Sequence, residues 1–599
     1  MIYHCEDHTC NYWDEGEKLP ERCPQCGRKL LRANEADMTG DDWTALGNTL
    51  WDAEASDKKR MVDCFRKAAY LGSAWGVCNL GICMEQGNGV EADPVQAFWL
   101  YQQAVEMGSL NAVCCLGVCY EYGIGTAPDA EKAAELYCKA AEYGSPRGQM
   151  LLAHAFHDGI GVEADAAEAV HWVRAAAYQR YGEGMHRLGV CYEYGDGVEQ
   201  NWERAVHWFR EAAESGVSAA MTDLGYCYEK GCGVEQSWEQ AFSWYRRGAE
   251  CGYPVSMSNL GLCYKRGYGV EQNWQEAIKW YEQGAQCGDL QSMHNLACCY
   301  ERGEGVEQNE ERALYWYRRS AEGGNGDAMC NLGRCYERGY GVEQNWQEAV
   351  KWYEQGAQCG NLQSMHNLAC CYEHGEGVEQ NMTEAIRWYT AAAEGGNADA
   401  MHDLGWLYDH GEGVEQDMKK AICWYERAAE QNHPAAMNSL GECYAMGRGV
   451  PRDLETAMEW YRRAAELGEA MADYNMGWHL EQAGKLSEAY AHYRKAADGN
   501  DDSAWWALGR FYENGVVVAQ DGKEARRCYE TGEKLGNVKC KMRLARCKLL
   551  GIGGRRAKKA GLDLCRQALE LAKESSEKED YGYEAEMNLL RRTIAENES

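Results

Sequence analysis

The chain has 599 residues and a formal net charge of −33, with 94 acidic against 61 basic side chains. A chain with this excess of acidic side chains lacks the broad basic surface that binds nucleic acid or acidic membranes. Neither is therefore expected as a partner. It contains no run of about 18 apolar residues that could span a bilayer, and its first residues, MIYHCEDHTC, lack the pattern of a secretory signal. Its thirty cysteines are too sparse for a secreted disulfide scaffold, which favours a cytoplasmic protein.

Four cysteines near the N-terminus are spaced as C-x4-C-x12-C-x2-C, namely Cys5, Cys10, Cys23 and Cys26. The second half, C-P-Q-C-G, resembles the knuckle of a zinc ribbon or a rubredoxin-type centre, where a tight turn directs two thiolates to one ion. Four thiolates close a tetrahedral shell, so we expect a structural zinc site, with iron as the alternative metal. Because Cys5 and His8 have the more usual knuckle spacing, His8 is an alternative to Cys10 as a ligand.

The rest of the chain is dominated by one period. A Leu-Gly or Leu-Ala pair, here called the anchor, recurs every 36 residues from Leu80 to Leu440, and the series extends at similar steps to Leu46, Met476, Leu508 and Leu544. Fifteen units therefore cover roughly residues 41–572. Such a period indicates a repeat architecture in which each unit is one supersecondary element.

A well-formed unit, residues 292–325, predicts two helices. Apolar side chains at helical spacing form one stripe in 292–309 (Met293, Leu296, Ala297, Tyr300) and another in 310–325 (Ala313, Trp316, Tyr317, Ala321). Glycines end each helix, because glycine accepts the left-handed backbone found at many helix termini. One helix pair cannot bury both stripes by itself, so neighbouring units are expected to stack as a solenoid.

This pattern resembles the Sel-one-like repeat, a relative of the tetratricopeptide repeat, as in M-S-N-L-G-L-C-Y-K-R-G-Y-G-V-E-Q-N-W-Q-E-A-I-K-W-Y-E-Q-G-A at 257–285. The resemblance implies an all-α fold, a right-handed superhelical solenoid of about fifteen antiparallel helix pairs. We expect three parts: a zinc-ribbon-like metal knuckle over 1–34, the repeat solenoid over 35–572, and a capping helix and tail over 573–599, with that helix near 582–597.

Most remaining cysteines are expected to be core residues. One column lies just before a repeated Tyr, where cysteine behaves as a small hydrophobe: Cys119, Cys191, Cys227, Cys263, Cys299, Cys335, Cys371 and Cys443. His294 and Cys298 lie one helical turn apart, as do His366 and Cys370, so each pair offers two of the ligands that a metal site would need. Two ligands do not complete a site, and the near-identity of 273–309 and 345–381 indicates that duplication copied the pair.

Partner-binding residues are expected on the first helix of each unit, because the first helix lines the concave wall of the related tetratricopeptide fold. Positions two residues after the anchor include three side chains of the types that dominate interfaces: Tyr226, Arg334 and Trp406. Directly before the anchor runs a series of asparagines, whose amides both donate and accept hydrogen bonds and so suit an extended peptide: Asn259, Asn295, Asn331 and Asn367.

Near the C-terminus, residues 534–566 reverse the charge of the chain, with many Lys and Arg against Asp563 alone. Terminal repeats need a polar outer face, so capping is the simplest interpretation. Attraction to the acidic body and binding of an anionic partner are the alternatives.

The predicted function is a non-catalytic scaffold or adaptor that binds partner proteins or peptides along its concave face. One alternative is a hydrolase acting on β-lactams, as suggested for cysteine-rich relatives, although no activated Ser or Cys beside His and Asp stands out in the sequence. The other is a nucleic-acid-associated factor that uses the metal knuckle and the basic C-terminal stretch. The chain is therefore not expected to be an enzyme, and a monomer is expected.

Overall fold

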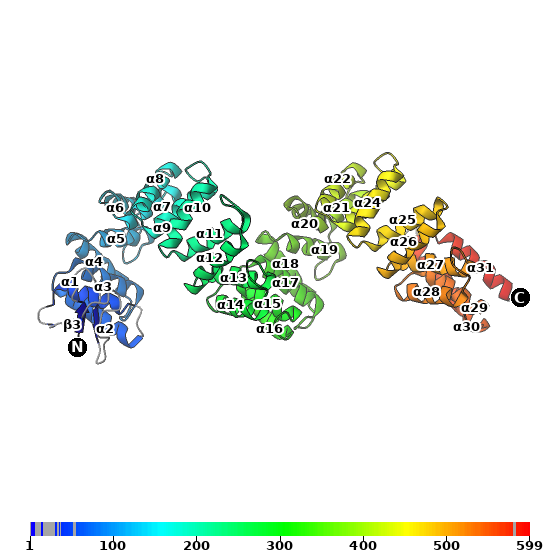
Figure 1. The fold of residues 1–599 in the computed structure, drawn as a ribbon, viewed down its shortest axis with the longest axis horizontal. Helices are drawn as coiled ribbons and strands as arrows, with labels where there is room; N and C mark the ends of the chain where they lie inside the picture. The colour runs from blue at the N-terminus through cyan, green and yellow to red at the C-terminus, as the bar shows by residue number, and fades with distance from the viewer. Residues whose placement is uncertain are drawn as a thin grey trace. The chain divides into compact units, whose positions relative to one another are not determined.

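The computed structural model describes residues 2–5, 13–15, 30–32, 35, 38–51, 55–578 and 583–598 (Figure 1). The fold is built from paired helices that stack along the chain, as the repeat pattern predicts. Its internal contacts divide the chain into two units, residues 1–309 and 310–599, each of which is described by itself.

Three short strands precede the helices: β1 (Ile2–Cys5), β2 (Trp13–Glu15) and β3 (Leu30–Arg32). They form an antiparallel sheet of order β2-β1-β3, in which His4 pairs with Trp13 and Cys5 pairs with Leu30. The sequence analysis did not predict these strands. The predicted metal ligands Cys10, Cys23, Cys26 and His8 lie outside the described residues, as does the side chain of Cys5.

The described residues of the first unit form helices α1 to α15. Their bounds are α1 (Gly40–Thr49), α2 (Ala55–Tyr70), α3 (Ala74–Gln86), α4 (Pro94–Glu106), α5 (Leu110–Tyr122), α6 (Ala130–Glu142), α7 (Pro146–Asp158), α8 (Ala166–Tyr178), α9 (Gly182–Tyr194), α10 (Trp202–Glu214), α11 (Ser218–Lys230), α12 (Trp238–Glu250), α13 (Pro254–Arg266), α14 (Trp274–Gln286) and α15 (Leu290–Arg302). Odd numbers are the first helices of successive repeats.

The second unit continues the alternation. Its helices are α16 (Glu310–Glu322), α17 (Gly326–Arg338), α18 (Trp346–Gln358), α19 (Leu362–His374), α20 (Met382–Gly395), α21 (Ala398–His410), α22 (Met418–Glu430), α23 (Pro434–Met446), α24 (Leu454–Glu466), α25 (Ala470–Gln482), α26 (Leu486–Asp498), α27 (Asp502–Asn514), α28 (Gly522–Lys534), α29 (Val538–Leu550), α30 (Lys558–Lys578) and α31 (Glu584–Glu598). The helix expected near 582–597 is α31.

The G-x-G-V-E-Q segment between the helices of a repeat is a structural connection. In the α13–α14 repeat, Gly267 ends α13 with a φ of +74°. A Cβ on Gly269 would lie 2.2 Å from the carbonyl oxygen of Trp238, so this glycine permits close contact with the preceding repeat. The side chain of Gln272 donates a hydrogen bond of 2.8 Å to the carbonyl of Lys265, one of the unpaired carbonyls at the end of α13. The motif therefore fixes the turn and does not bind phosphate.

The core of each repeat centres on the Tyr that follows the repeated Trp in the second helix. Tyr353 is fully buried, whereas Trp352 is half-buried. The ring of Tyr353 lies against Gly333, the glycine of the anchor, where an added Cβ would be 2.5 Å from the ring. The Tyr353 hydroxyl donates a hydrogen bond of 2.5 Å to Glu337 on the first helix. The same contact recurs in other repeats, between Tyr101 and Glu85, Tyr137 and Glu121, Tyr245 and Glu229, and Tyr389 and Glu373.

These contacts make a first prediction about stability. The phenylalanine variant Tyr353→Phe is expected to lower the free energy of unfolding by about 1 kcal/mol, the usual contribution of one hydrogen bond. Tyr281 is the matched control, because its buried hydroxyl has no hydrogen-bond partner among the described residues. Tyr281→Phe is therefore expected to be neutral or slightly stabilising, and urea denaturation of both variants would measure the difference. Equal losses would show that the hydrogen bond to Glu337 contributes nothing specific.

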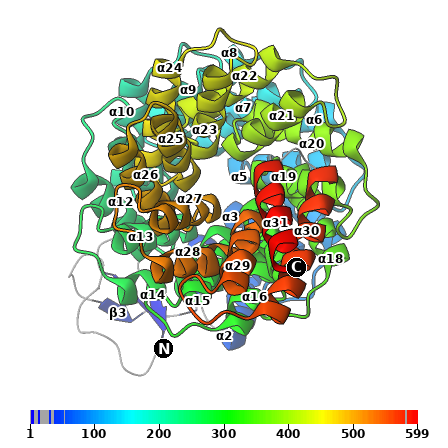
Figure 2. The same cartoon turned by 90° about the vertical axis from the view of Figure 1, so that its right-hand side faces the viewer.

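The cysteine column is buried, as predicted, and Cys299 is buried while its neighbour Cys298 is only half-buried. First helices also contact the first helices of the next repeat, such as α11 with α13 and α17 with α19, whereas no described second helix has comparable contacts with the next second helix. Within each unit the first helices therefore lie closer together and form the inner side of the stack (Figure 2).

Candidate functional site

The predicted partner-binding residues all lie on first helices. In the first unit Tyr226 is on α11, Asn259 on α13 and Asn295 on α15. In the second unit the predicted residues are Asn331 and Arg334 on α17, Asn367 on α19 and Trp406 on α21. The predicted first-helix location is thus observed in each unit, and the residues differ in how far they are available for binding.

The aromatic candidates present accessible rings. The Tyr226 side chain is 43% exposed, and the Lys230 ammonium lies 5.8 Å from the centre of its ring. Trp406 is half-buried and stacks on His410, with ring centres 4.2 Å apart. Aromatic rings of this kind supply large contact areas at interfaces.

The asparagine candidates instead form hydrogen bonds within the chain. The Asn295 amide donates to Ser258 at 3.5 Å and accepts from Gln291 at 3.2 Å. The Asn367 amide donates to the Cys330 sulfur at 3.6 Å, and Gln363 donates to the Asn367 oxygen at 3.0 Å. These amides thus link neighbouring first helices, a role that sequence reasoning did not assign to them.

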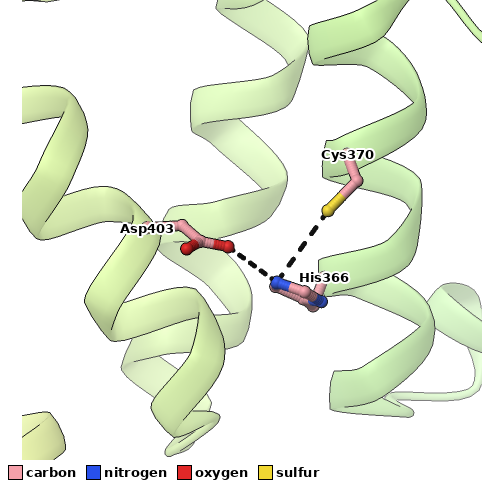
Figure 3. A group of neighbouring side chains, drawn as sticks. All are labelled: His366, Cys370 and Asp403. Carbon is pink, nitrogen blue, oxygen red and sulfur yellow. Dashed lines mark hydrogen bonds and ion pairs between the residues drawn. The ribbon is translucent and has the colours of Figure 1, made fainter. Parts of the chain in front are cut away.

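A cluster of chemically active side chains lies between α19 and α21 (Figure 3). The Nε2 atom of His366 lies 2.9 Å from Oδ2 of Asp403 and 3.9 Å from Sγ of Cys370. The three ligand atoms all lie within 4.8 Å of one another, and no other group of three is so arranged among the described residues. The sequence analysis identified His366 and Cys370 but missed Asp403, because it lies 37 residues from His366 in the next repeat.

The hydrogen-bond contacts in this cluster differ from those of a nucleophilic triad. In a triad the nucleophile and the orienting carboxylate contact opposite nitrogens of the imidazole. Here Cys370 and Asp403 both contact Nε2 (Figure 3). The carboxylate therefore competes with the thiol for the nitrogen that would accept its proton, and the geometry gives the hydrolase alternative no support.

The electrostatics of the cluster favour charged groups. Burial lowers the pKa of His366, but hydrogen bonds to Asp403 and Cys370, together with their charges, outweigh it and raise that pKa to about 10. Burial likewise opposes ionisation of Asp403, but His366 and His402 hold its pKa well below the usual range. The cluster thus stabilises a positive charge beside the carboxylate.

Further polar side chains lie beside this cluster on the inner side of the second unit. His402 donates from Nδ1 to the second oxygen of Asp403 at 3.1 Å, and its ring centre lies 5.2 Å from that of His433, the N-cap residue of α23. His433 in turn contacts Asp399 at 3.1 Å. Polar contacts therefore join three successive first helices.

The first unit contains a different feature, a cavity of about 590 Å³ bordered by α5, α7, α8 and α9. Arg147, Arg187, His154 and His157 line it together with Glu121 and Glu183. Its mixed charge suits polar side chains of a partner better than a purely apolar ligand. Sequence reasoning missed this cavity, because the basic residues and histidines that line it do not recur at the repeat spacing.

No helix in the described part of the chain is long and apolar enough to cross a membrane.

Comparison with known proteins identifies the repeat. The model of the Sel1 repeat matches thirteen segments, which are 76–109, 112–145, 146–181, 182–217, 218–253, 254–289, 290–325, 326–361, 362–397, 398–433, 434–469, 470–501 and 504–537. These segments span most of the chain.

The chain belongs to the Sel1 repeat family. Among solved structures it is similar to c5321, a protective antigen of uropathogenic Escherichia coli with an SLR fold, at 32% identity and a TM-score of 0.50, covering 75% of this chain and 97% of that one. It is also similar to a Sel1 repeat protein from Oxalobacter formigenes, at 33% identity and a TM-score of 0.37, covering 41% of this chain and 96% of that one. No curated protein matches the sequence.

The Sel1 repeats place the cluster in the architecture. His366 and Cys370 belong to the repeat at 362–397, and Asp403 belongs to the next Sel1 repeat, at 398–433. The first and last helix pairs, α1 with α2 and α29 with α30, lie outside the matched segments. The Sel1 repeat solenoid is a fold typical of protein–protein interaction scaffolds.

Proposed function

We propose that this Sel1 repeat protein is a non-catalytic scaffold that binds partner proteins or peptides along the inner side formed by its first helices. The observation that carries the proposal is the variation within this one chain. Positions that the stack requires repeat almost unchanged, such as the buried Tyr and the anchor, whereas the position two residues after the anchor differs between repeats: Val190, Tyr226, Leu262, Cys298, Arg334, Cys370, Trp406 and Glu442.

This variation follows from the physics of the stack. A buried position must fill the same space in every repeat, so one residue type recurs. A position on the inner side is not constrained in that way. Its residue type is free to differ between repeats, so that each repeat suits the part of a partner that it contacts. Tyr226, Arg334 and Trp406 add the side-chain types that contribute most to interfaces.

The test compares inner and outer positions. Single variants Tyr226→Ala, Arg334→Ala and Trp406→Ala are each expected to weaken capture of a partner by about 10-fold, since a hot-spot side chain contributes more than about 1 kcal/mol. Lys351→Ala and Arg387→Ala are the matched controls, because both residues are exposed on second helices. Capture from lysate that is lost equally in the control variants would contradict the proposal.

We propose in addition that residues 1–34 hold a structural metal ion, zinc before iron, through Cys5, Cys23, Cys26 and either Cys10 or His8. The pairing of Cys5 with Leu30 supports this, because the chain that follows Cys26 enters the sheet beside Cys5. Four protein ligands would leave no open position for chemistry, and a segment this short is rarely stable without such a metal.

We further propose that the protein is a cytoplasmic monomer. The described cysteines are thiols, which fits a reducing compartment. Some charges of the basic C-terminal stretch are neutralised within the chain. Arg543 and Arg546 both form ion pairs with Glu513, and Arg543 forms another with Glu586. These pairs favour attraction to the acidic body over an anionic partner.

A further inference from the structure

We propose that His366, Cys370 and Asp403 form a second metal site, specific for a divalent ion of the zinc class, between the first helices of two consecutive Sel1 repeats. The site is distinct from the N-terminal knuckle and would hold its ion through three protein ligands. The fourth position would take water or a side chain of a bound partner.

The distances fit such an ion. Zinc binds imidazole nitrogen and carboxylate oxygen at about 2.0–2.2 Å and thiolate sulfur at about 2.3 Å, so tetrahedral ligand atoms lie about 3.3–3.6 Å apart. The separations of His366 Nε2 from Asp403 oxygen and Cys370 sulfur, 2.9 and 3.9 Å, lie on either side of that range. The third separation, between the Cys370 sulfur and the Asp403 oxygen, lies within 4.8 Å, so the side chains have to draw closer for all three atoms to reach bonding distance.

The backbone holds the ligands in place. His366 and Cys370 are one turn apart on α19 and so lie on the same side of that helix. Asp403 is on α21, the first helix of the next repeat. The His366 side chain is 14% exposed and that of Asp403 is 36% exposed, so the site is both sheltered and accessible to an ion from solvent.

Each ligand also has a supporting contact. Nδ1 of His366 lies 3.4 Å from the Asn367 oxygen and 3.3 Å from the Gln363 amide nitrogen, so two polar side chains of α19 contact the ring on the side away from Nε2. His402 contacts the second oxygen of Asp403 at 3.1 Å. The Tyr389 hydroxyl donates its proton to Glu373 at 2.6 Å, and its oxygen lies 3.2 Å from the Cys370 sulfur. Such second contacts are usual around metal ligands, because they fix the orientation of the ring or carboxylate.

The mixture of ligands indicates the class of ion. A thiolate excludes calcium and magnesium, which bind through oxygen, and a carboxylate with imidazole suits zinc or cobalt better than a copper(I) site. Thiolate and carboxylate together supply two negative charges against the two positive charges of the ion.

Other repeats have parts of this arrangement. His186 contacts Asp223 at 2.6 Å in the first unit, but Val190 occupies the position that corresponds to Cys370. His294 and Cys298 repeat the histidine–thiol pair on α15, with the sulfur 3.7 Å from Nε2, and the residue 72 positions before Asp403 is Asn331. The third ligand therefore distinguishes the proposed site from the copies of its parts.

The test counts metal ions in the full chain. Protein that has been stripped with a chelator and reloaded with zinc under reducing conditions is analysed by elemental mass spectrometry. Cys370→Ser, His366→Gln and Asp403→Asn are each expected to hold one ion fewer per chain than the unaltered protein. Loading with cobalt provides a second measurement, because the thiolate–cobalt absorption band is expected to be weaker in Cys370→Ser.

The matched control is the double variant His294→Gln with Cys298→Ser, which removes the copied pair and is expected to keep the full number of ions. Circular dichroism of each variant would show whether its helices are retained. A Cys370→Ser variant that is folded and holds as many zinc ions as the unaltered chain would overturn the proposal, as would an equal loss in the double variant. Cys23→Ser with Cys26→Ser tests the knuckle separately, since its loss of an ion adds to that of Cys370→Ser.

Discussion

Replacing Tyr353 with alanine is expected to lower the free energy of unfolding of the surrounding repeats by about 3–5 kcal/mol, the usual cost of removing a large buried aromatic side chain. The ring is fully buried, lies against Gly333 and donates a hydrogen bond to Glu337, so the variant leaves a cavity and an unpaired carboxylate. Because each repeat is stabilised mainly by its neighbours, the effect should be local. Hydrogen exchange of α17 to α20 would measure it.

The adjacent Trp352→Ala variant is the control. The two side chains differ in burial, although they are neighbours in the same repeated dipeptide. We therefore expect clearly faster exchange in Tyr353→Ala than in Trp352→Ala. A larger effect at Trp352 would mean that the tryptophan column, and not the tyrosine column, forms the centre of the stack.

Replacing Glu586 with alanine is expected to release α31 from the end of the second unit. Glu586 is buried, and both of its oxygens accept hydrogen bonds from Arg543, at 2.6 and 2.8 Å. The indole of Trp506 donates to the same carboxylate at 3.3 Å. Without Glu586, Arg543 keeps only its contact with Glu513, which Arg546 shares. The variant is therefore expected to cost up to about 3–5 kcal/mol, the range for breaking a buried ion pair.

Limited proteolysis would detect this release as new cleavage near α31. Arg591→Ala is the control, because Arg591 is exposed on the same helix and, within the described part of the chain, forms a hydrogen bond to Asn588 on the same helix. The control variant is expected to resist protease as well as the unaltered protein. Equal resistance in Glu586→Ala would show that the ion pairs do not hold α31 in place.

Much of the fold was predictable because its signals repeat. The anchor, the glycines that end the helices and the apolar stripes each recur at fixed spacing, and they predicted the helix pairs and the buried cysteine column. The hydrogen bond between Tyr353 and Glu337 was harder to predict, because the two residues are 16 positions apart and glutamate on a helix surface is usually solvated. Glutamates at the corresponding position of other repeats accept the same hydrogen bond: Glu85, Glu121, Glu229 and Glu373.

The candidate sites were only partly predictable for a related reason. The helical turn places His366 beside Cys370, so one helix suffices to predict that contact. Asp403 joins them only when two repeats are packed together, and its distance depends on how closely α19 approaches α21. Asn295 and Asn367, which were predicted to bind a peptide, form hydrogen bonds with neighbouring first helices that the sequence did not predict; their binding to a peptide stays a prediction.

Site-specific photo-crosslinking in cells that produce the protein tests most directly whether the first helices bind partners. A photoreactive amino acid replaces Arg334 or Trp406 on first helices, and Lys351 or Arg387 on second helices, one position at a time. If the first helices carry the binding function, both inner positions are expected to crosslink to the same partner and the outer positions to give no such product. Crosslinking of that partner from Lys351 and Arg387, with none from Arg334 or Trp406, would contradict the account.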